Sequence, residues 1–297
     1  MVLIAGSTGT LGGLICQILA EKKVAIRALV RSSSNKETVK SLAKLGAEVV
    51  EGDFRDSASL ARACAGVQTV ISTVSAMPTR YTPGDNDIAA VDLRGTKALI
   101  DAARAAGVER FVYVSFSLDN RCPLRDAKRD VERHLMASGM TYTVLQPSAF
   151  METWLGPLVG FDYAKASVRI YGTGDKPISY ISVRDVAAFA TAALETTAAA
   201  NALVPLGGPE AISPNAAVKI FEQIAGRPFT VERVPVEALT QQQKEATDPM
   251  QKSFATLMLN MAAGDAISMA TTARDFGIRL RSVRQYAEEA LPQAVRA

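Results

Sequence analysis

The chain has few of the residues that build metal centres and disulfide frameworks. Its three cysteines, Cys16, Cys64 and Cys122, are scattered, and His134 is its single histidine. Because no two cysteines stand at the spacing of metal ligands, neither a zinc site nor a disulfide framework is predicted. His134 lies in a helical pattern, where a solvated or capping role is the better interpretation. The sequence therefore predicts no metal site.

Dense blocks of one charge and long apolar runs are also missing. Lys and Arg number 33 against 30 Asp and Glu, which leaves a formal charge of +3, and no basic block of the kind that follows a phosphate backbone is present. No apolar run is long enough to cross a bilayer, and residues 1–5 lack the basic start and cleavage site of a secretory signal. We expect a cytoplasmic protein without nucleic-acid or membrane partners, and leave a homodimer open.

The chain does contain a steady alternation of short apolar runs and helical patterns. Residues 1–5 and 24–30 are typical of strands, and residues 11–20 repeat apolar side chains at helical spacing. Further strands are expected at residues 48–51, 69–74, 110–115 and 142–145, and helices at 42–45, 60–64, 91–106 and 129–137. Such alternation requires right-handed crossovers and a parallel sheet covered on both faces. This predicts a Rossmann-type, doubly wound α/β fold.

After residue 147 the pattern loosens, because glycines and prolines interrupt short segments. We predict a Rossmann domain over residues 1–150 and a smaller C-terminal α/β substrate lobe over 151–297, with residues 178–205 returning to the main sheet. Helices are expected at 183–194, where Asp185 is placed to cap the first turn, and at 215–225, 236–246 and 283–291. The Met-rich residues 250–269 leave three interpretations open: a mobile lid, a partner surface or a core helix.

A glycine-rich turn joins the first strand to the first helix: Gly6, Ser7, Thr8, Gly9, Thr10, Leu11 and Gly12. In a βαβ unit this pattern predicts a dinucleotide site. Gly6 permits the tight turn, and Gly9 lets the backbone approach the pyrophosphate. Gly12 lets helix and strand pack closely while the helix N-terminus faces the anion. A tight turn without a ligand is the alternative.

The end of the second strand indicates which dinucleotide is bound. An NAD site usually carries an acid there for the ribose hydroxyls, but this chain has Arg31 followed by serines. Arg31, with Arg27, Ser32 and Ser33, can instead bind a 2′-phosphate, which favours NADP(H) and leaves NAD(H) open. A solvated Arg31 is the alternative. Asp53 and Phe54 end the third strand and are expected to flank the adenine.

Several segments together resemble one family. They are the glycine turn, residues 24–31, residues 51–56, Gly95 with Thr96, residues 111–115, residues 142–147 and residues 181–187. With these segments the chain resembles, over most of its length, the NmrA-like branch of atypical short-chain dehydrogenase/reductases, which includes isoflavone-reductase-like and quinone-reductase-like proteins. The resemblance implies an NAD(P)H-dependent oxidoreductase.

The resemblance also implies where the nicotinamide lies. Ser75 and Ala76 after the fourth strand, and Pro147 with Ser148 after the sixth, are expected beside it. Lys128 matches the family's active-site lysine. In related enzymes that lysine holds the nicotinamide ribose and lowers the pKa of a neighbouring tyrosine, which donates a proton.

The expected tyrosine position, four residues before Lys128, is Leu124. Leucine neither donates nor accepts a proton, so we expect Lys128 itself to act as the acid, with a pKa lowered toward neutrality by partial burial. Ser117 is expected to orient a substrate carbonyl. The alternative is that Lys128 is one more surface cation of its helix.

Two functions follow from these residues. The first is an NADPH-preferring reductase that passes a hydride to a small apolar carbonyl, quinone or enone, with Phe150, Met151 and Trp154 lining the substrate pocket. Each of these three side chains is equally compatible with plain core packing. The second is a non-catalytic NADP(H)-binding sensor, regulator or assembly factor, which the missing tyrosine supports. We favour the reductase because the lysine is retained and the expected pocket is apolar.

Overall fold

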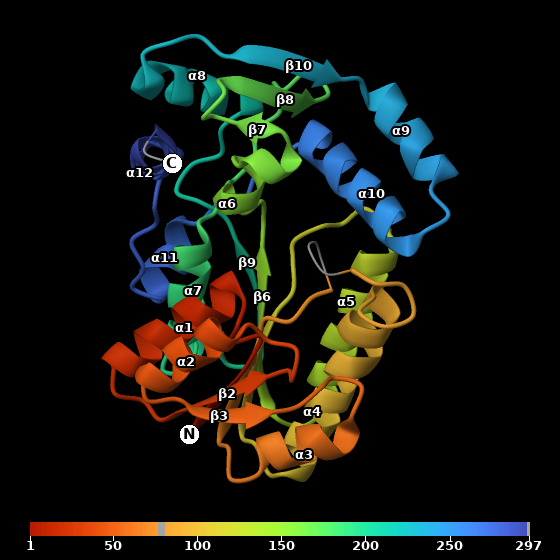
Figure 1. The fold of residues 1–297 in the computed structure, drawn as a ribbon, viewed down its shortest axis with the longest axis vertical. Coiled ribbons are helices and arrows are strands. Elements are labelled where there is room, and N and C mark those ends of the chain that lie inside the picture. Colours follow the sequence, from red (N-terminus) through yellow and green to blue (C-terminus); the bar gives the residue numbers. More distant parts are fainter. Residues whose placement is uncertain (77–80, 296–297) are drawn as a thin grey trace. The chain divides into compact units, whose positions relative to one another are not determined.

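A computed structural model describes residues 1–76 and 81–295 (Figure 1). The backbone divides into two compact units, and each is assembled from segments that are distant in sequence. Unit 1 comprises Met1–Phe116, Pro123–Gln146 and Val186–Val204, and unit 2 comprises Ser117–Cys122, Pro147–Asp185 and Pro205–Ala297. The division into a domain of residues 1–150 and a lobe of residues 151–297 stays a prediction.

The main sheet has seven strands in the order β3-β2-β1-β4-β5-β6-β9. The strands are β1 Val2–Ala5, β2 Ile26–Val30, β3 Glu48–Glu51, β4 Thr69–Ser72, β5 Arg110–Val114, β6 Thr141–Pro147 and β9 Ala202–Leu206. β1 pairs in parallel with β2 on one side and with β4 on the other, so Val2 lies opposite both Ile26 and Thr69. The strand order reverses at β1, where open α/β sheets bind ligands. The predicted doubly wound parallel fold is confirmed.

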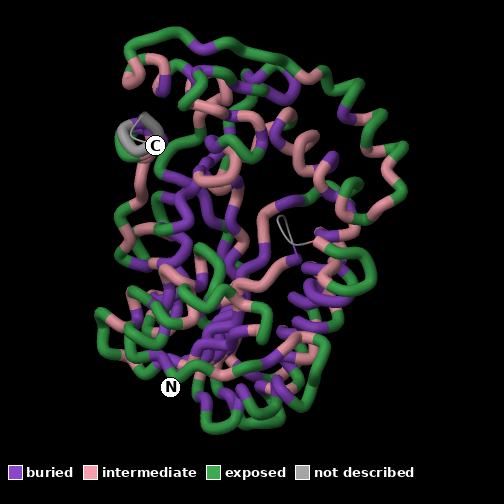
Figure 2. The backbone as a smooth tube through the Cα atoms, viewed as in Figure 1, coloured by how far each residue is buried: buried purple, intermediate pink, exposed green. Residues whose placement is uncertain are grey.

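Helices cover this sheet. They are α1 Thr10–Glu21, α2 Lys36–Lys44, α3 Ser57–Cys64, α4 Thr96–Ala105, α5 Pro123–Met136 and α7 Val183–Ala192, with the short turn η3 Thr197–Ala199. Buried side chains of α3, α4 and α5, such as Leu60, Leu99 and Val131, form one core with Leu3 and Phe111 of the sheet. Figure 2 shows this core as buried backbone along the strands. The period-2 and helical patterns of the sequence place these residues inward.

The helix predicted at residues 91–106 differs from the structure in its start and its type. It begins at Ile88 as a π-helix, η1 Ile88–Gly95, and continues as α4. Asp87 caps η1 by accepting a hydrogen bond from the Ala90 amide at 2.7 Å. Gly95 lies against Phe54, and a Cβ at Gly95 would come within 2.6 Å of the Phe54 Cβ. π-helical turns frequently occur at functional sites, and η1 contains the buried Asp92.

Unit 2 contains a three-stranded sheet in the order β10-β8-β7. The strands are β7 Phe161–Asp162, β8 Ser167–Tyr171 and β10 Thr230–Val234. β8 pairs in parallel with β10 and antiparallel with β7. The helical elements are α6 Met151–Trp154, η2 Pro157–Val159, α8 Pro214–Ala225, α9 Val236–Glu245, α10 Pro249–Ala263, α11 Ala270–Asp275 and α12 Val283–Val295. Their role as a substrate lobe stays a prediction.

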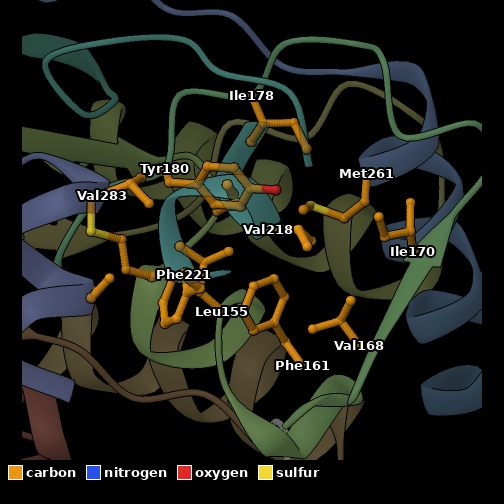
Figure 3. Packing of buried hydrophobic residues seen from close by; sticks show 14 of the residues in the cluster. Leu155, Phe161, Val168, Ile170, Ile178, Tyr180, Val218, Phe221, Met261 and Val283 are labelled. Carbon is orange, nitrogen blue, oxygen red and sulfur yellow. The ribbon is translucent and has the colours of Figure 1, made fainter. Parts of the chain in front are cut away.

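The core of unit 2 contains several residues for which the sequence left alternatives open. Figure 3 shows Phe161, Phe221 and Met261 in one cluster, and the rings of the two phenylalanines are 4.9 Å apart. Met261 belongs to α10, so of the three interpretations of residues 250–269 the core helix fits its inward side. Met151 is fully buried in the same core, and the half-buried Trp154 packs against it.

The start of α7 corrects one expectation. Asp185 does not cap the helix. The first amides of α7 are bound by other side chains: Glu152 accepts from the Val183 N–H at 2.9 Å, and Ser182 accepts from the Arg184 N–H at 3.2 Å. Asp185 instead accepts from the Arg281 N–H at 2.9 Å. Asp185 fails as a cap because it lies inside the first turn, where its side chain meets the chain segment before α12.

Among the described helices, none has the length and apolarity to span a membrane.

Candidate active site

A pocket of about 440 Å³ lies in unit 1 where the first strands of the sheet end. Its lining includes Gly6, Thr8, Gly9, Thr10, Leu11, Arg31, Ser34, Asn35, Thr38, Asp53, Phe54, Arg55, Ser75, Ala76, Asp85 and Asn86. These residues follow β1, β2, β3 and β4, so the pocket is at the carboxyl edge of the sheet beside the reversal of strand order. The topology predicts a ligand at this place.

The glycine turn has the shape that a close backbone approach requires. Gly6 has a φ of +90°, and a Cβ there would lie 2.5 Å from the Thr73 hydroxyl oxygen. A Cβ on Gly12 would lie 2.2 Å from the carbonyl oxygen of Gly6, so α1 packs on the turn only because Gly12 has no side chain. Gly9 stands at the N-cap of α1 without a capping side chain. The amides of the first turn are therefore suited to an anion such as a pyrophosphate.

Two residues of the predicted turn shape it rather than line the pocket. Ser7 is fully buried, and its hydroxyl donates to the Leu29 carbonyl at 2.8 Å. Gly12 is held against Gly6, as described. Ser7 thereby ties the turn to β2, and its side chain is directed away from the place predicted for the cofactor.

Arg31 lines the pocket, whereas the three residues expected to assist it do not. The Arg31 Nη1 donates to Oδ1 of Asn86 at 3.4 Å. Ser32 and Ser33 are exposed outside the pocket lining. Arg27 donates to the carbonyls of residues 63 and 65 and forms an ion pair with Glu48. The expectation for Arg27 is wrong because its guanidinium is already bound to α3 and β3.

The sequence did not indicate the polar residues that accompany Arg31 in the pocket. Ser34 accepts from the Arg31 amide at 3.0 Å, and Asn35 caps α2 by accepting from the amides of Glu37 and Thr38. The run of serines after β2 was the available signal, but it did not show which serine turns inward. Only the conformation of the turn selects Ser34.

Asp53 and Phe54 both line the pocket, so their predicted place beside the adenine stays a prediction, and Asp53 is bound to Arg55. The Arg55 Nε and Nη2 donate to the two Asp53 oxygens at 2.8 and 2.7 Å. These hydrogen bonds lower the pKa of the Asp53 carboxyl to about 2, with smaller contributions from the charges of Arg55 and Arg31. Arg55 was not predicted as a site residue, because a lone arginine in a turn carries no motif.

Lys128 is the centre of a buried polar cluster. Its side chain is only 6% exposed, and its Nζ lies 3.5 Å from Oδ1 of the fully buried Asp92 and 3.4 Å from the Tyr113 hydroxyl. Asp92 also accepts from the Ser75 hydroxyl at 2.7 Å and from the Ala76 amide at 3.0 Å. Lys128 is therefore not a surface cation. Since Ser75 and Ala76 line the pocket, the cluster is fixed to the pocket wall.

The expected lowering of the Lys128 pKa is wrong. Burial by itself lowers the pKa of Lys128, but the Tyr113 hydroxyl and the Asp92 carboxylate raise it, and the net direction is upward. Burial also raises the pKa of Tyr113 to about 12. The missing information was the counter-charge: Asp92 comes from η1, and no motif connects it to Lys128. Lys128 stays an ammonium that is neutralised by a buried carboxylate.

Ser117 and Ser148 meet at a different carboxylate, in unit 2. Both hydroxyls reach Oδ2 of Asp265, at 2.7 and 2.8 Å. An ionised carboxylate only accepts hydrogen bonds, so both serines donate to it. The proton with which Ser117 was expected to orient a carbonyl is thus engaged by Asp265. Pro147, also predicted for the cofactor, accepts from the Ser117 amide at 3.0 Å.

The sequence model of the NmrA-like family matches residues 1–274 of the chain. The chain belongs to the NmrA-like family. The resemblance deduced from the sequence is confirmed, and the Lys128 cluster and the glycine turn are parts of an NmrA-like Rossmann unit.

Curated relatives of this NmrA-like protein include reductases and assembly factors. The photosystem II assembly factor Ycf39 of Cyanophora paradoxa is 30% identical over 241 residues, which cover 80% of this chain and 73% of the relative. The NAD(P)H azoreductase of Xenophilus azovorans is 30% identical over 249 residues, which cover 81% and 79%. The family thus contains NAD(P)H-dependent reductases and proteins named for assembly.

Solved structures share the fold over nearly the whole chain. The NADPH-dependent quinone oxidoreductase of Escherichia coli, in its complex with NADPH, has a TM-score of 0.77 at 22% identity and covers 97% of this chain and 99% of its own. Isoflavone reductase has a TM-score of 0.77 at 23% identity and covers 97% and 98%. At these identities the likeness is one of fold.

Proposed function

We propose that this NmrA-like protein is an NADPH-preferring reductase that passes a hydride to a small, flat, apolar acceptor, a quinone, an enone or another carbonyl compound. The observation that carries the proposal is the Lys128–Asp92 pair, which is attached through Ser75 and Ala76 to the wall of the glycine-turn pocket. A buried ion pair beside a pocket at the carboxyl edge of the sheet is the arrangement expected of an active site.

Several residues of the pocket support the binding of a nicotinamide dinucleotide. The amides at the start of α1 suit the pyrophosphate, and Phe54 offers an apolar wall for the adenine. Arg31, Ser34 and Asn35 supply a cation and hydrogen bonds for a 2′-phosphate. Ser75 and Ala76 then belong to the nicotinamide end, as the family resemblance implies. When bound, the cofactor supplies the hydride.

Lys128 supports the reaction as a fixed positive charge. Hydride addition to a carbonyl or quinone leaves negative charge on the acceptor oxygen, and a preorganised cation stabilises that charge in a water-poor site. Because its pKa is raised, Lys128 keeps its proton at neutral pH. Asp92 fixes the ammonium of Lys128. It also accepts hydrogen bonds from the Ser75 hydroxyl and the Ala76 amide, which holds both residues in the pocket wall. Tyr113 is fully buried, and its hydroxyl lies 3.4 Å from the Lys128 Nζ.

The test is steady-state oxidation of NADPH with a panel of quinones, enones and aldehydes. Removing the charge in Lys128→Met should lower kcat/KM by about a hundredfold, the usual range for a group that assists proton or charge transfer. Lys40→Met removes an exposed lysine of α2 and should change kcat/KM by less than about twofold. An equal effect of the two variants would contradict the role of Lys128.

A second function is supported by a separate observation. The similarity to Ycf39 points to assembly, and Leu124, at the position where the family resemblance implies a tyrosine, is buried and apolar. For this alternative NADPH should bind, but no acceptor of the panel should speed its oxidation. NADPH binding measured by calorimetry beside the turnover assay separates a reductase from a sensor or assembly factor.

A further inference from the structure

The rim of the cofactor pocket contains a turn that begins after β4 and leads into η1, residues 81–87. Asp85 and Asn86 of this turn line the pocket. The turn is tied internally, because Thr82 and Asn86 bond backbone to backbone at 3.1 and 3.0 Å. Asp87 fixes it to η1 by accepting from the Gly84 amide at 2.8 Å and the Ala90 amide at 2.7 Å. Asp85 and Asn86 are therefore held in place at the rim.

These two neighbours each hold an arginine of the pocket. Asp85 forms an ion pair with Nη1 of Arg55, and Asn86 accepts from Nη1 of Arg31. Successive Cα atoms lie about 3.8 Å apart, so the two guanidinium groups converge on one part of the rim. They come from the ends of β3 and β2, which pair side by side. An anion placed there can contact both arginines.

The two carboxylates on Arg55 are not equivalent. Asp53 binds Nε and Nη2 in a bidentate manner, and its side chain is 30% exposed. Asp85 binds Nη1 alone and is 54% exposed. Bidentate pairing fixes the orientation of a guanidinium, whereas a single exposed contact is readily exchanged. Asp53 thus orients Arg55, and Nη1 is the donor that can change its partner.

We propose that Arg55 is a second ligand of the cofactor's 2′-phosphate and that the Asp85 carboxylate occupies the place of this phosphate until the cofactor binds. This inference rests on the proposed NADPH-binding function and adds the residues that set the preference between the two cofactors. A phosphate dianion displaces Asp85 from Nη1 and bridges Arg55 and Arg31. NADH has only an uncharged 2′-hydroxyl at this position, so it leaves the Arg55–Asp85 pair intact.

Arg55 and Asp85 then have opposite effects on the binding of NADPH and no effect on the binding of NADH. Loss of Arg55 removes a charge-assisted contact to the 2′-phosphate. Loss of the Asp85 charge removes the competitor and the repulsion that it exerts on the phosphate. Neither change alters the contacts of an adenosine that carries a free 2′-hydroxyl. Asp85 therefore weakens NADPH binding, and Arg55 strengthens it.

The experiment is calorimetric titration with two matched probes, 2′,5′-ADP and 5′-AMP, which differ only in the 2′-phosphate. Arg55→Ala should weaken 2′,5′-ADP binding about tenfold, the lower end for hydrogen bonds to a charged group at an exposed site, and leave 5′-AMP within about twofold. Asp85→Asn should strengthen 2′,5′-ADP binding severalfold. Arg62→Ala on α3 and Asp119→Asn, both at exposed residues, are the matched controls and should bind both probes like the wild type.

The double variant Arg55→Ala/Asp85→Asn decides whether Asp85 acts through Arg55. If the two compete as proposed, Asp85→Asn gives no gain once Arg55 is absent. An undiminished gain in the double variant, or an equal loss of both probes in Arg55→Ala, overturns the inference. In those cases wild-type binding of NADPH remains and the proposed function stands. Failure of the wild type to bind NADPH, NADH or either probe overturns the proposed function together with the inference.

Discussion

Asp92 in unit 1 and Asp265 in unit 2 are both held by serine hydroxyls, yet their surroundings differ. Asp92 is fully buried and has the Lys128 ammonium beside it. Asp265 is half-buried, and within residues 1–76 and 81–295 the contacts resolved at its side chain are the two hydroxyls of Ser117 and Ser148 rather than a cation. A fully buried carboxylate needs a counter-charge, whereas water assists a half-buried one.

This difference shows how the same contact can serve two purposes. At Asp92 the hydrogen bond from Ser75 supports a carboxylate that neutralises Lys128, so Lys128 stays charged inside the protein. At Asp265 the hydrogen bonds orient two hydroxyls, and their removal leaves no buried charge behind. We therefore expect substitutions of the two carboxylates to differ most in their effect on the free energy of unfolding.

The largest effect is expected for Asp92→Asn, which leaves the Lys128 ammonium buried without its counter-charge. Breaking a buried pair in this way costs about 3–5 kcal/mol of unfolding free energy. Urea denaturation followed by circular dichroism measures this loss. The double variant Asp92→Asn/Lys128→Met removes both charges and should regain more than half of it. A single variant as stable as the wild type would contradict the pairing.

Alkaline pH tests the same pair without a substitution of Asp92. The pKa of Lys128 is raised in the folded state above its unfolded value of about 10.4. Its contribution is therefore fully present below about pH 10 and is lost as the pH rises through the folded pKa. The unfolding free energy of the wild type, measured from pH 8 to 11.5 with the Asp92→Asn/Lys128→Met variant as control, should fall more steeply above about pH 10. If the unfolding free energies of the wild type and the double variant fell in parallel, the prediction that ionised Lys128 stabilises the fold would be wrong.

Asp265→Asn should cost much less than Asp92→Asn. The amide still accepts from one serine and donates to the other, so we expect a loss of about 1 kcal/mol in unfolding free energy, the ordinary value of a neutral hydrogen bond. The measurement is the same urea titration, with Asp119→Asn as an exposed control. A loss as large as that of Asp92→Asn would show that Asp265 neutralises a charge, and the comparison would fail.

The smallest effect concerns the ion pair of Asp53 with Arg55, which is partly exposed at the pocket rim. The Asp53 pKa of about 2 in the folded state means that the contribution of this carboxylate is present above the unfolded pKa and is lost as the pH falls toward 2. Arg55→Ala should return the Asp53 pKa toward about 3.9, and because both side chains are solvent-accessible the stability change should stay below about 1 kcal/mol. Carboxyl carbon NMR titration measures the pKa, with Arg62→Ala as control. An unchanged pKa would mean that Arg55 is not its cause.

The predictable parts of the fold are those encoded by neighbouring residues. The strand predicted at 48–51 is β3 to the residue, and the helix predicted at 11–20 is α1 with one more residue at each end. The π-helical start before α4 could not be predicted. It depends on the cap from Asp87 and on the closeness of Gly95 to Phe54, which lies far back in the chain.

The site predictions divide in the same way. Gly6, Gly9 and Gly12 could be predicted because turn and motif lie in one short segment. Lys128 was predicted only through the family resemblance, and its environment was mistaken. The contact of Asp265 with Ser117 could not be predicted, since the two residues lie 148 positions apart.

The alternation of strands and helices, the glycine turn and the NmrA-like membership follow from local order and spacing in the sequence. The partners of the charged groups depend on the tertiary fold: Asp92 lies beside Lys128, Asp265 beside Ser117, and Asp85 on Arg55. The direction in which a buried pKa moves depends on the balance between desolvation and the nearest opposite charge. Folding brings that charge from a distant segment, so no local pattern can specify it.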